Sequence, residues 1–303
     1  MYTKILVPLD GSELAEGVLP YVRSLARELQ LPVTLLQVID PDIISAFADP
    51  AQKHYFDNVA AGMKMSSADY LRKLVPSFAH SLKVDAAVEI GKPAETIVSK
   101  AASDPGTLIA MATHGRSGIQ RWIMGSVADK VLHATGNHLL LVRPRGEPTT
   151  INEAAPLKSI VIPLDGSGLA ETVLPYAIEL AQKLKAEIIL LRAYALPASI
   201  YNVTDEYVPN LEQLNAQLRS ETKEYLDGKV QELKGKGVDK VSGILLEGYG
   251  AAEIIDFAKK TPDNIVAMCT HGRSGVGRWV LGSVTERVVK NSGDPVLVIR
   301  AQS

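Results

Sequence analysis

Short apolar runs alternate with helical patterns along the chain, and this alternation predicts the secondary structure. Residues 5–9 form a continuous apolar run rich in branched side chains, which is typical of a strand buried on both faces. Similar runs follow in the first half of the chain. The strands that we expect there cover residues 5–9, 33–39, 84–90, 108–112 and 139–142.

Apolar residues at spacings of three and four predict helices between these strands. Directly after the first strand, Ser12 is placed to cap such a helix. Pro20, and Pro175 in the second half, are expected to kink it because proline cannot donate a hydrogen bond to the carbonyl four residues earlier. The apolar positions that mark this helix and the next one are Leu14, Val18, Val22, Leu25 and Leu29, then Leu71, Leu74, Val75, Phe78 and Leu82.

Strands that alternate with helices predict a parallel sheet with right-handed crossovers and helices on both faces. The predicted fold class is therefore α/β, with a doubly wound sheet. In such sheets a ligand binds beyond the carboxyl ends of the strands, at the point where the strand order reverses. "PLDGS" (8–12) follows the first expected strand and "THGRSG" (113–118) follows the fourth, so these two loops are the candidates for a site.

An internal repeat sets the domain organisation. "ILVPLDGS" at 5–12 returns as "IVIPLDGS" at 160–167, and "ATHGRSGIQRWIMGSV" at 112–127 returns as "CTHGRSGVGRWVLGSV" at 269–284. We therefore expect two copies of one domain. The Pro-rich junction between them has no periodicity and is typical of a linker. The expected boundaries are 1–145 for the first domain, 146–157 for the linker and 158–303 for the second domain.

Two long segments, 41–66 and 196–221, differ most between the repeats and exceed the usual length of a connection. We interpret them as lids or partner surfaces, with packed loops as the alternative. The last strands of the repeats, at 138–143 and 295–300, would leave apolar edges exposed unless they are paired. This predicts an intramolecular pseudo-dimer of the two repeats, and a further homodimer of whole chains stays open.

Composition narrows the class of protein. The formal net charge is −2 and no block of like charges occurs, which argues against a nucleic acid or membrane partner. A single cysteine, Cys269, excludes an internal disulfide framework and is typical of a reducing compartment. The chain lacks an apolar run long enough to span a membrane, and its N-terminus enters a strand pattern at once. We expect a cytoplasmic protein.

The loop after the fourth strand carries chemistry suited to phosphates. Glycines such as Gly115 let a ligand approach the backbone, and Gly125 with Ser126 opens a helix whose free N–H groups attract anions. Arg116 and Arg121 are placed to neutralise part of the charge. The alternative is plain turn chemistry. In that interpretation His114 and His271 bond neighbouring backbone, Trp122 and Trp279 anchor packing, and Asp10 and Asp165 only cap helices.

Well-known catalytic signatures are missing from the sequence. It contains no GxxxxGK[ST], HExxH, CxxC or GxSxG, and its histidines lack metal-ligand spacing. We expect no catalytic residue and no metal ligand, and favour a binding module. Three functions stay open: a regulatory nucleotide-binding protein, an interaction protein that binds no nucleotide, and an enzyme such as a weak ATPase.

The pairing of "VPLDGS" with "THGRSG…GSV" in each half resembles the universal stress protein family over nearly the whole chain. The resemblance implies an adenine nucleotide alpha-hydrolase-like fold with five parallel strands in order 3-2-1-4-5. It also implies a regulatory module of the stress response that binds ATP or AMP, with Mg²⁺ as an optional companion ion. The family's ATP-binding branch carries Gly, two residues, Gly, nine residues, then Gly-Ser or Gly-Thr.

This chain keeps the second and third parts of that motif and departs from the first. Ala112 and Cys269 stand where the family has its first glycine, so their side chains reduce the clearance beside the ribose and inner phosphates. The resemblance makes the N-terminal site the better candidate. It places Asp10 beside the adenosine and the Val38 backbone beside the adenine, with Ala193 at the position of Val38 in the second half. The candidate nucleotide-binding residues are Pro8, Asp10, Val38, Met111, Ala112, His114, Gly115, Arg116, Gly125, Ser126 and Val127, then Pro163, Asp165, Ala193, Met268, Cys269, His271, Gly272, Arg273, Gly282, Ser283 and Val284.

Overall fold

The computed structural model describes residues 2–47, 53–115, 124–144, 153–196, 210–270 and 281–300. The chain divides into two compact units, Met1–Pro156 and Leu157–Ser303, which we call the first and second units. Among the described residues, we find no helix with the length and apolar character needed to cross a membrane. That the two units pair through their last strands stays a prediction.

The first unit is built on five parallel strands in the order β3-β2-β1-β4-β5. This confirms the predicted order and fold class. Ile5 in β1 lies opposite Val33 in β2 on one side and Leu108 in β4 on the other. The strands are β1 (Lys4–Pro8), β2 (Val33–Ile39), β3 (Val84–Ile90), β4 (Thr107–Ala112) and β5 (Leu139–Val142).

The second unit repeats this sheet in the order β8-β7-β6-β9-β10, again with parallel neighbours. Ile160 in β6 lies opposite Ile188 in β7, as Ile5 lies opposite Val33 in the first unit. The two units therefore share one register, which allows position-by-position comparison. The strands are β6 (Ser159–Pro163), β7 (Glu187–Tyr194), β8 (Val241–Glu247), β9 (Asn264–Cys269) and β10 (Val296–Ile299).

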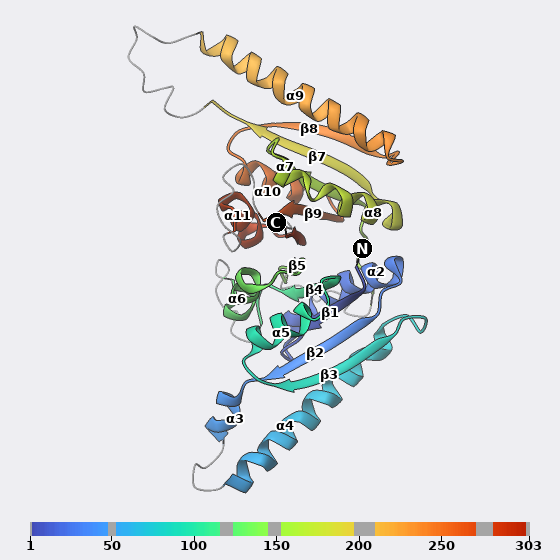
Figure 1. Cartoon of the computed structure of the whole chain (residues 1–303), viewed down its shortest axis with the longest axis vertical. Helices are drawn as coiled ribbons and strands as arrows, with labels where there is room; N and C mark the ends of the chain where they lie inside the picture. The colour runs from blue at the N-terminus through green and yellow to red at the C-terminus, as the bar shows by residue number, and fades with distance from the viewer. Residues whose placement is uncertain are drawn as a thin grey trace, which may run out of the picture. The chain divides into compact units, whose positions relative to one another are not determined.

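Helices cover both faces of each sheet. In the first unit α4 lies along one face of β2 and β3, and α5 lies on the opposite face (Figure 1). The first unit contains α1 (Glu13–Glu16), α2 (Leu19–Leu29), α3 (Pro41–Phe47), α4 (Lys53–Leu74), the 3-10 turn η1 (Val75–Ser77), α5 (Pro93–Ala102) and α6 (Ser126–Ala134). The second contains α7 (Gly168–Glu171), α8 (Leu174–Leu184), α9 (Leu211–Gly235), α10 (Ala251–Lys260) and α11 (Ser283–Asn291).

The segment after β1 differs from the single kinked helix that we predicted. It forms two helices, and Pro20 lies in the first turn of α2, where its missing N–H leaves no intrahelical bond unmade. Pro175 does the same in α8. The predicted cap is confirmed, because the Ser12 Oγ accepts a hydrogen bond from the backbone N–H of Ala15 at 3.2 Å.

The next helix also differs from its prediction. α4 begins at Lys53 and ends at Leu74, so Val75, Phe78 and Leu82 lie beyond it. A 3-10 turn, Val75–Ser77, follows directly, because Pro76 disfavours continued α-helical backbone at the residue before it. Much of segment 41–66 is therefore helical, as is segment 211–221, rather than irregular.

The end of the predicted linker is attached to the first unit. The Ala155 N–H donates to the Pro20 carbonyl at 3.0 Å, and the Ser24 hydroxyl donates to the Ala155 carbonyl. The beginning of the linker lies outside the described residues. Its role as a linker stays a prediction.

The core lies between the sheet and its helices, and it predicts a large cost for truncating Leu35. This side chain is 0% exposed, so Leu35→Ala should lower the free energy of unfolding of the first unit by about 2–5 kcal/mol through lost contacts and a cavity. Hydrogen exchange of β1 to β5 measures the loss. Leu169→Ala, at a side chain 39% exposed, is the control and should change stability by less than about 0.5 kcal/mol. Equal effects of the two variants would contradict this account of the core.

Candidate functional site

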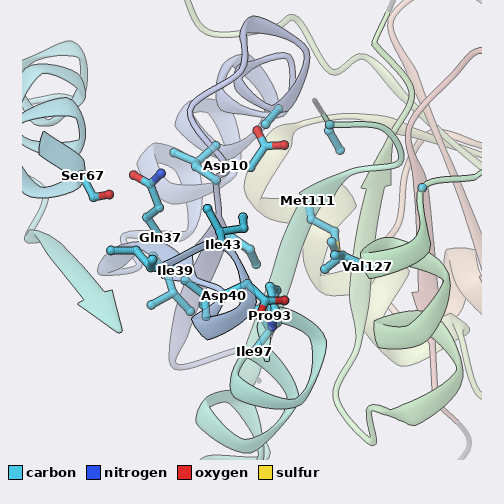
Figure 2. Close-up of a pocket in the computed structure, with 18 of the residues that line it drawn as sticks. Asp10, Gln37, Ile39, Asp40, Ile43, Ser67, Pro93, Ile97, Met111 and Val127 are labelled. Atoms are coloured by element: carbon cyan, nitrogen blue, oxygen red, sulfur yellow. The ribbon is translucent and has the colours of Figure 1, made fainter. Parts of the chain in front are cut away.

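A cavity of about 600 Å³ opens at the carboxyl ends of the strands in the first unit, where β1 lies between β2 and β4. This is the point of strand-order reversal at which α/β sheets bind ligands. Figure 2 shows Asp10 and Gln37 on one side of the cavity and Met111 and Val127 on the other. The predicted residues that line it are Pro8, Asp10, Val38, Met111, Ala112, His114, Gly115, Gly125, Ser126 and Val127.

The Asp10 carboxylate joins the loops that follow β1 and β4. Its Oδ1 accepts hydrogen bonds from the Ser12 backbone N–H at 3.0 Å and from the Ser12 hydroxyl at 2.6 Å. Its Oδ2 lies so close to Gly115 that a Cβ added there would collide with it. Asp10 therefore organises the turn before α1 without capping the helix, whose N-cap is Ser12, and it also lines the cavity. Gly115 is the residue that permits this approach.

The start of α6 presents backbone donors at the same cavity. Gly125 is its N-cap and forms no side-chain cap hydrogen bond. The Gly125 N–H already has an acceptor within the protein, because it donates to the Thr113 carbonyl at 2.8 Å. The next N–H groups, those of Ser126 and Val127, belong to the first turn and so have no acceptor within the helix. Both residues line the cavity, where this helix end favours an anion.

His114 makes a different contact from the backbone bond that we considered. Its Nδ1 lies 2.9 Å from the hydroxyl of Thr113. Its Nε2 is buried and has no hydrogen-bond partner among the described residues. His114 is also one of the residues that line the cavity.

The second unit has a smaller cavity, of about 430 Å³, at the equivalent place. Asp165 repeats the pattern of Asp10, accepting from the Ser167 N–H at 2.9 Å and the Ser167 hydroxyl at 2.6 Å. The Gly282 N–H donates to the Thr270 carbonyl at 2.7 Å, like that of Gly125. The predicted residues that line this cavity are Pro163, Asp165, Ala193, Met268, Cys269, Gly282, Ser283 and Val284.

Cys269 occupies the position of the missing glycine in the second unit. Its side chain is 4% exposed, and its Sγ accepts a hydrogen bond from the Thr172 hydroxyl at 3.2 Å. Ala112, the equivalent residue of the first unit, is 7% exposed. Both side chains border their cavities, so each takes space that a glycine would leave free.

Several sequence-predicted residues lie outside the described part of the chain. They are Arg116, Arg121, Trp122, His271, Gly272, Arg273 and Trp279. The predicted charge neutralisation by arginine therefore stays a prediction in both units.

Sequence reasoning missed the wall that α4 contributes to the first cavity. Gly62, Met63, Ser66 and Ser67 line it from that helix, and Gln37 lines it from β2. The signals were a glutamine inside the apolar run "VTLLQVI" and the serine pair 66–67, which precedes the apolar positions that predict the second helix. In the second unit the missed residues include Gly248, Tyr249 and Gly250.

An ion pair borders the first cavity between the end of β2 and the start of α5. The Lys92 Nζ contacts Asp40 Oδ1 at 3.2 Å and also pairs with Asp42. The pKa of Asp40 is lowered, first by a hydrogen bond from the Asp42 backbone N–H and then by Lys92. The bonds to Asp42 and Asp40 raise the pKa of Lys92. Both groups stay charged at neutral pH, and they tie α3 to α5.

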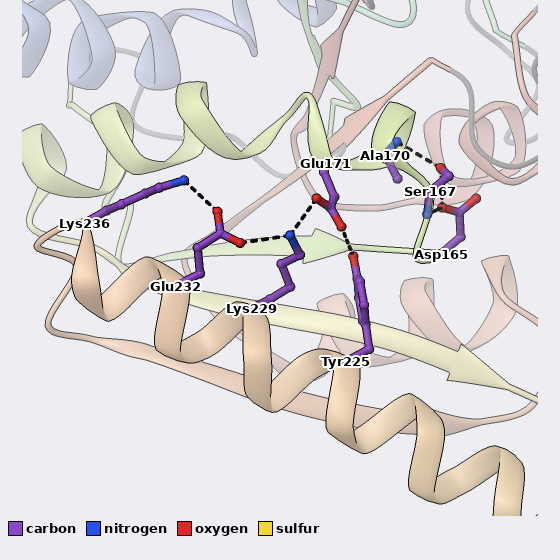
Figure 3. Close-up of polar contacts among 8 residues, drawn as sticks. All are labelled: Asp165, Ser167, Ala170, Glu171, Tyr225, Lys229, Glu232 and Lys236. Atoms are coloured by element: carbon purple, nitrogen blue, oxygen red, sulfur yellow. Dashed lines mark hydrogen bonds and ion pairs between the residues drawn. The ribbon is translucent and has the colours of Figure 1, made fainter.

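In the second unit a polar network connects α9 with α7 and β7 (Figure 3). The Tyr225 hydroxyl donates to Glu171 at 2.7 Å, and burial, followed by this bond, raises the pKa of Tyr225. Lys229 contacts both Glu171 and Glu232, at 2.7 and 2.9 Å. Arg192 stacks on the Tyr225 ring with its Cζ 4.4 Å from the centroid. The described lining of the second cavity includes residues of β6, β7 and β9 but none of α9.

Comparison with known proteins agrees with the architecture. The model of the universal stress protein family matches residues 1–143 and 156–300. A universal stress protein of Methanocaldococcus jannaschii is 36% identical over 143 residues, covering 47% of this chain and 82% of that protein. One of Mycolicibacterium smegmatis is 24% identical over 302 residues, covering 98% and 96%. A crystal structure of a universal stress protein from Archaeoglobus fulgidus shares the fold, with TM-score 0.68, 19% identity, and coverage of 100% and 98%.

The contact between Asp10 and Gly115 predicts the effect of a methyl group. Gly115→Ala should destabilise the first unit by about 1–3 kcal/mol, because Asp10 can move away only by losing its two bonds to Ser12. Thermal unfolding measures the change. Gly136→Ala is the matched control, since nothing lies within 4 Å of a Cβ added there. An unchanged melting temperature in Gly115→Ala would show that the two loops do not meet as described.

The ion pairs that Glu232 makes with Lys229 and Lys236 on α9 predict that stability falls at low pH. Hydrogen bonds from Lys236 and Lys229 lower the pKa of Glu232 from 4.5 to about 2. The resulting stabilisation is complete above pH 4.5 and is lost as the pH falls toward 2. Glu232→Gln should therefore cost less than about 1 kcal/mol at pH 7, since the pair is exposed. In urea unfolding, the difference from wild type should shrink below pH 4.5. Glu224→Gln, on the same helix, is the control, and a difference independent of pH would contradict the pairing.

Proposed function

Because the chain belongs to the universal stress protein family, we propose that it binds an adenine nucleotide, ATP or AMP, as a regulatory module of the stress response. The first cavity is the main site, and the bound nucleotide changes the contacts that the protein makes with its partners. We place this activity in the cytoplasm. The chain acts as a binding module, alone or as a homodimer.

The observation that carries this proposal is the convergence of three features on one cavity. The α6 start offers backbone donors for an anion, Asp10 offers a carboxylate for hydroxyl groups, and the walls are largely apolar. A volume of about 600 Å³ lies within the range of ligand pockets. This combination suits a ligand with a flat apolar base, a sugar and a phosphate chain.

Five candidate residues of the first cavity have defined roles in this proposal. Val38 and Met111 border the base, Asp10 faces the ribose, and Ser126 holds phosphate oxygens together with the amide of Val127. When present, Mg²⁺ would be held mainly by phosphate oxygens and water, with its charge offsetting that of the phosphates. The second cavity is smaller, and Cys269 stands where the first cavity has the smaller Ala112. We therefore propose that it is the weaker site.

The direct test is to denature the purified protein and search the supernatant for adenine nucleotide by chromatography. In parallel, ATP with Mg²⁺ is added to protein freed of ligand. We expect a stabilisation of about 2.7 kcal/mol when free ATP reaches one hundred times its Kd. A blank supernatant together with no thermal shift would contradict nucleotide binding and favour an interaction protein of the same fold.

A matched pair of variants assigns the site to one unit. Asp10 and Asp165 make the same bonds to Ser12 and Ser167, so Asp10→Ala and Asp165→Ala lose the same turn contacts. Asp10→Ala should weaken ATP binding by about tenfold, the loss of one strong hydrogen bond. Asp165→Ala should have a smaller effect. Isothermal titration measures both, and the reverse ranking would place the main site in the second unit.

A further inference from the structure

One position in the second strand of each sheet, on the side covered by α4 in the first unit and by α9 in the second, distinguishes the two cavities. Gln37 in β2 and Arg192 in β7 occupy equivalent places in the shared register, because Ile5 pairs with Val33 as Ile160 pairs with Ile188. In the second unit the Arg192 guanidinium covers Gly166, where an added Cβ would lie 2.9 Å from its Nη2. Its Cζ is also stacked on a tyrosine of α9. This charged group fills the position.

In the first unit the same position holds a buried polar residue at the edge of the cavity. Gln37 is 8% exposed and lines the cavity, and its Oε1 has no hydrogen-bond partner among the described residues. Figure 2 shows its carboxamide between Ser67 and Asp10. A buried amide oxygen without a partner destabilises a protein, so we take its place beside a ligand cavity as a sign that a ligand supplies the missing partner.

The surroundings of Gln37 indicate what that ligand presents. Ile39, Ile43 and Met63 form an apolar wall beside it, which suits the face of a flat ring. The carboxamide carries one acceptor and one donor side by side. This pattern pairs with the 6-amino group and N7 of adenine, whereas guanine offers two acceptors along the same edge.

We propose that Gln37 is a specificity-determining residue, which recognises the amino-bearing edge of adenine in the first unit. The proposal rests on the proposed function, because it names the group that reads the base at the same site. The second unit lacks this recognition, since Arg192 carries no acceptor and is engaged with Tyr225.

The test combines one change in the protein with one change in the ligand. Binding of ATP and of purine riboside triphosphate, which lacks the 6-amino group, is measured by titration calorimetry on wild type and on Gln37→Leu. In wild type, ATP should bind about tenfold more tightly than purine riboside triphosphate. In Gln37→Leu the two ligands should bind equally, because the partner of the amino group is gone.

Two further variants keep the test decisive. Gln37→Met repeats the loss of the amide with a flexible side chain of similar length, in case Gln37→Leu folds poorly. Gln182→Leu, at an exposed glutamine in the second unit, is the control and should preserve the wild-type preference for ATP. Circular dichroism establishes that each variant is folded.

The outcomes separate this inference from the proposed function. One outcome is that wild type binds ATP while Gln37→Leu or Gln37→Met lowers the affinity for both ligands by the same factor. In that case Gln37 contributes only packing and the inference is wrong, while nucleotide binding stands. If wild type binds neither ligand, both proposals are wrong. A preference for ATP that disappears only in the Gln37 variants supports the inference.

Discussion

The site depends on the close approach of two loops at the point where the strand order reverses. β1 and β4 are neighbours, and the loops that follow them bring the Asp10 carboxylate against Gly115. One oxygen of Asp10 is held by Ser12, so the other is fixed in place. The loop after β4 can therefore close on it only because Gly115 has no side chain. This contact sets the position of Gly115, which lines the cavity together with Asp10.

The two repeats use this common frame and differ in the walls that they build around it. In the first unit α4 contributes small and polar residues to the cavity, and the amide of Gln37 faces it. In the second unit the equivalent Arg192 stacks on Tyr225 and leaves no room there. The carboxylate turn and the helix start are retained in both units, so the repeats keep the anion-favouring end of the cavity and diverge at the wall that contains Gln37 or Arg192.

Much of the fold could be predicted, because it rests on local patterns. The apolar runs fixed the strands to within a residue at each end, and Ser12 marked the helix start. Pro20 was misjudged, since a proline in a helical pattern can either kink a helix or begin a new one, and only packing decides. α4 was missed over most of its length, because its pattern of buried positions is weak and Pro76 ends it early.

The candidate site was predictable only in its motif-bearing half. Gly115 and Gly125 stand out in sequence because glycines and a helix start imply a special backbone. Gln37 stands out only as a polar residue in an apolar run, and its role becomes visible only when the opposite wall of the cavity is known. Its burial beside Ser67 is a property of the packed unit.

Amide chemical shifts of the whole chain during a titration with ATP and Mg²⁺ test the central claim most directly. The account predicts saturable shifts at the amides of Gly115, Ser126 and Val127, with a smaller response at their counterparts in the second unit. The amide of Gly136, which lies outside the cavity lining, should stay unchanged. Saturating ATP that leaves Gly115 and Ser126 unshifted would contradict the account.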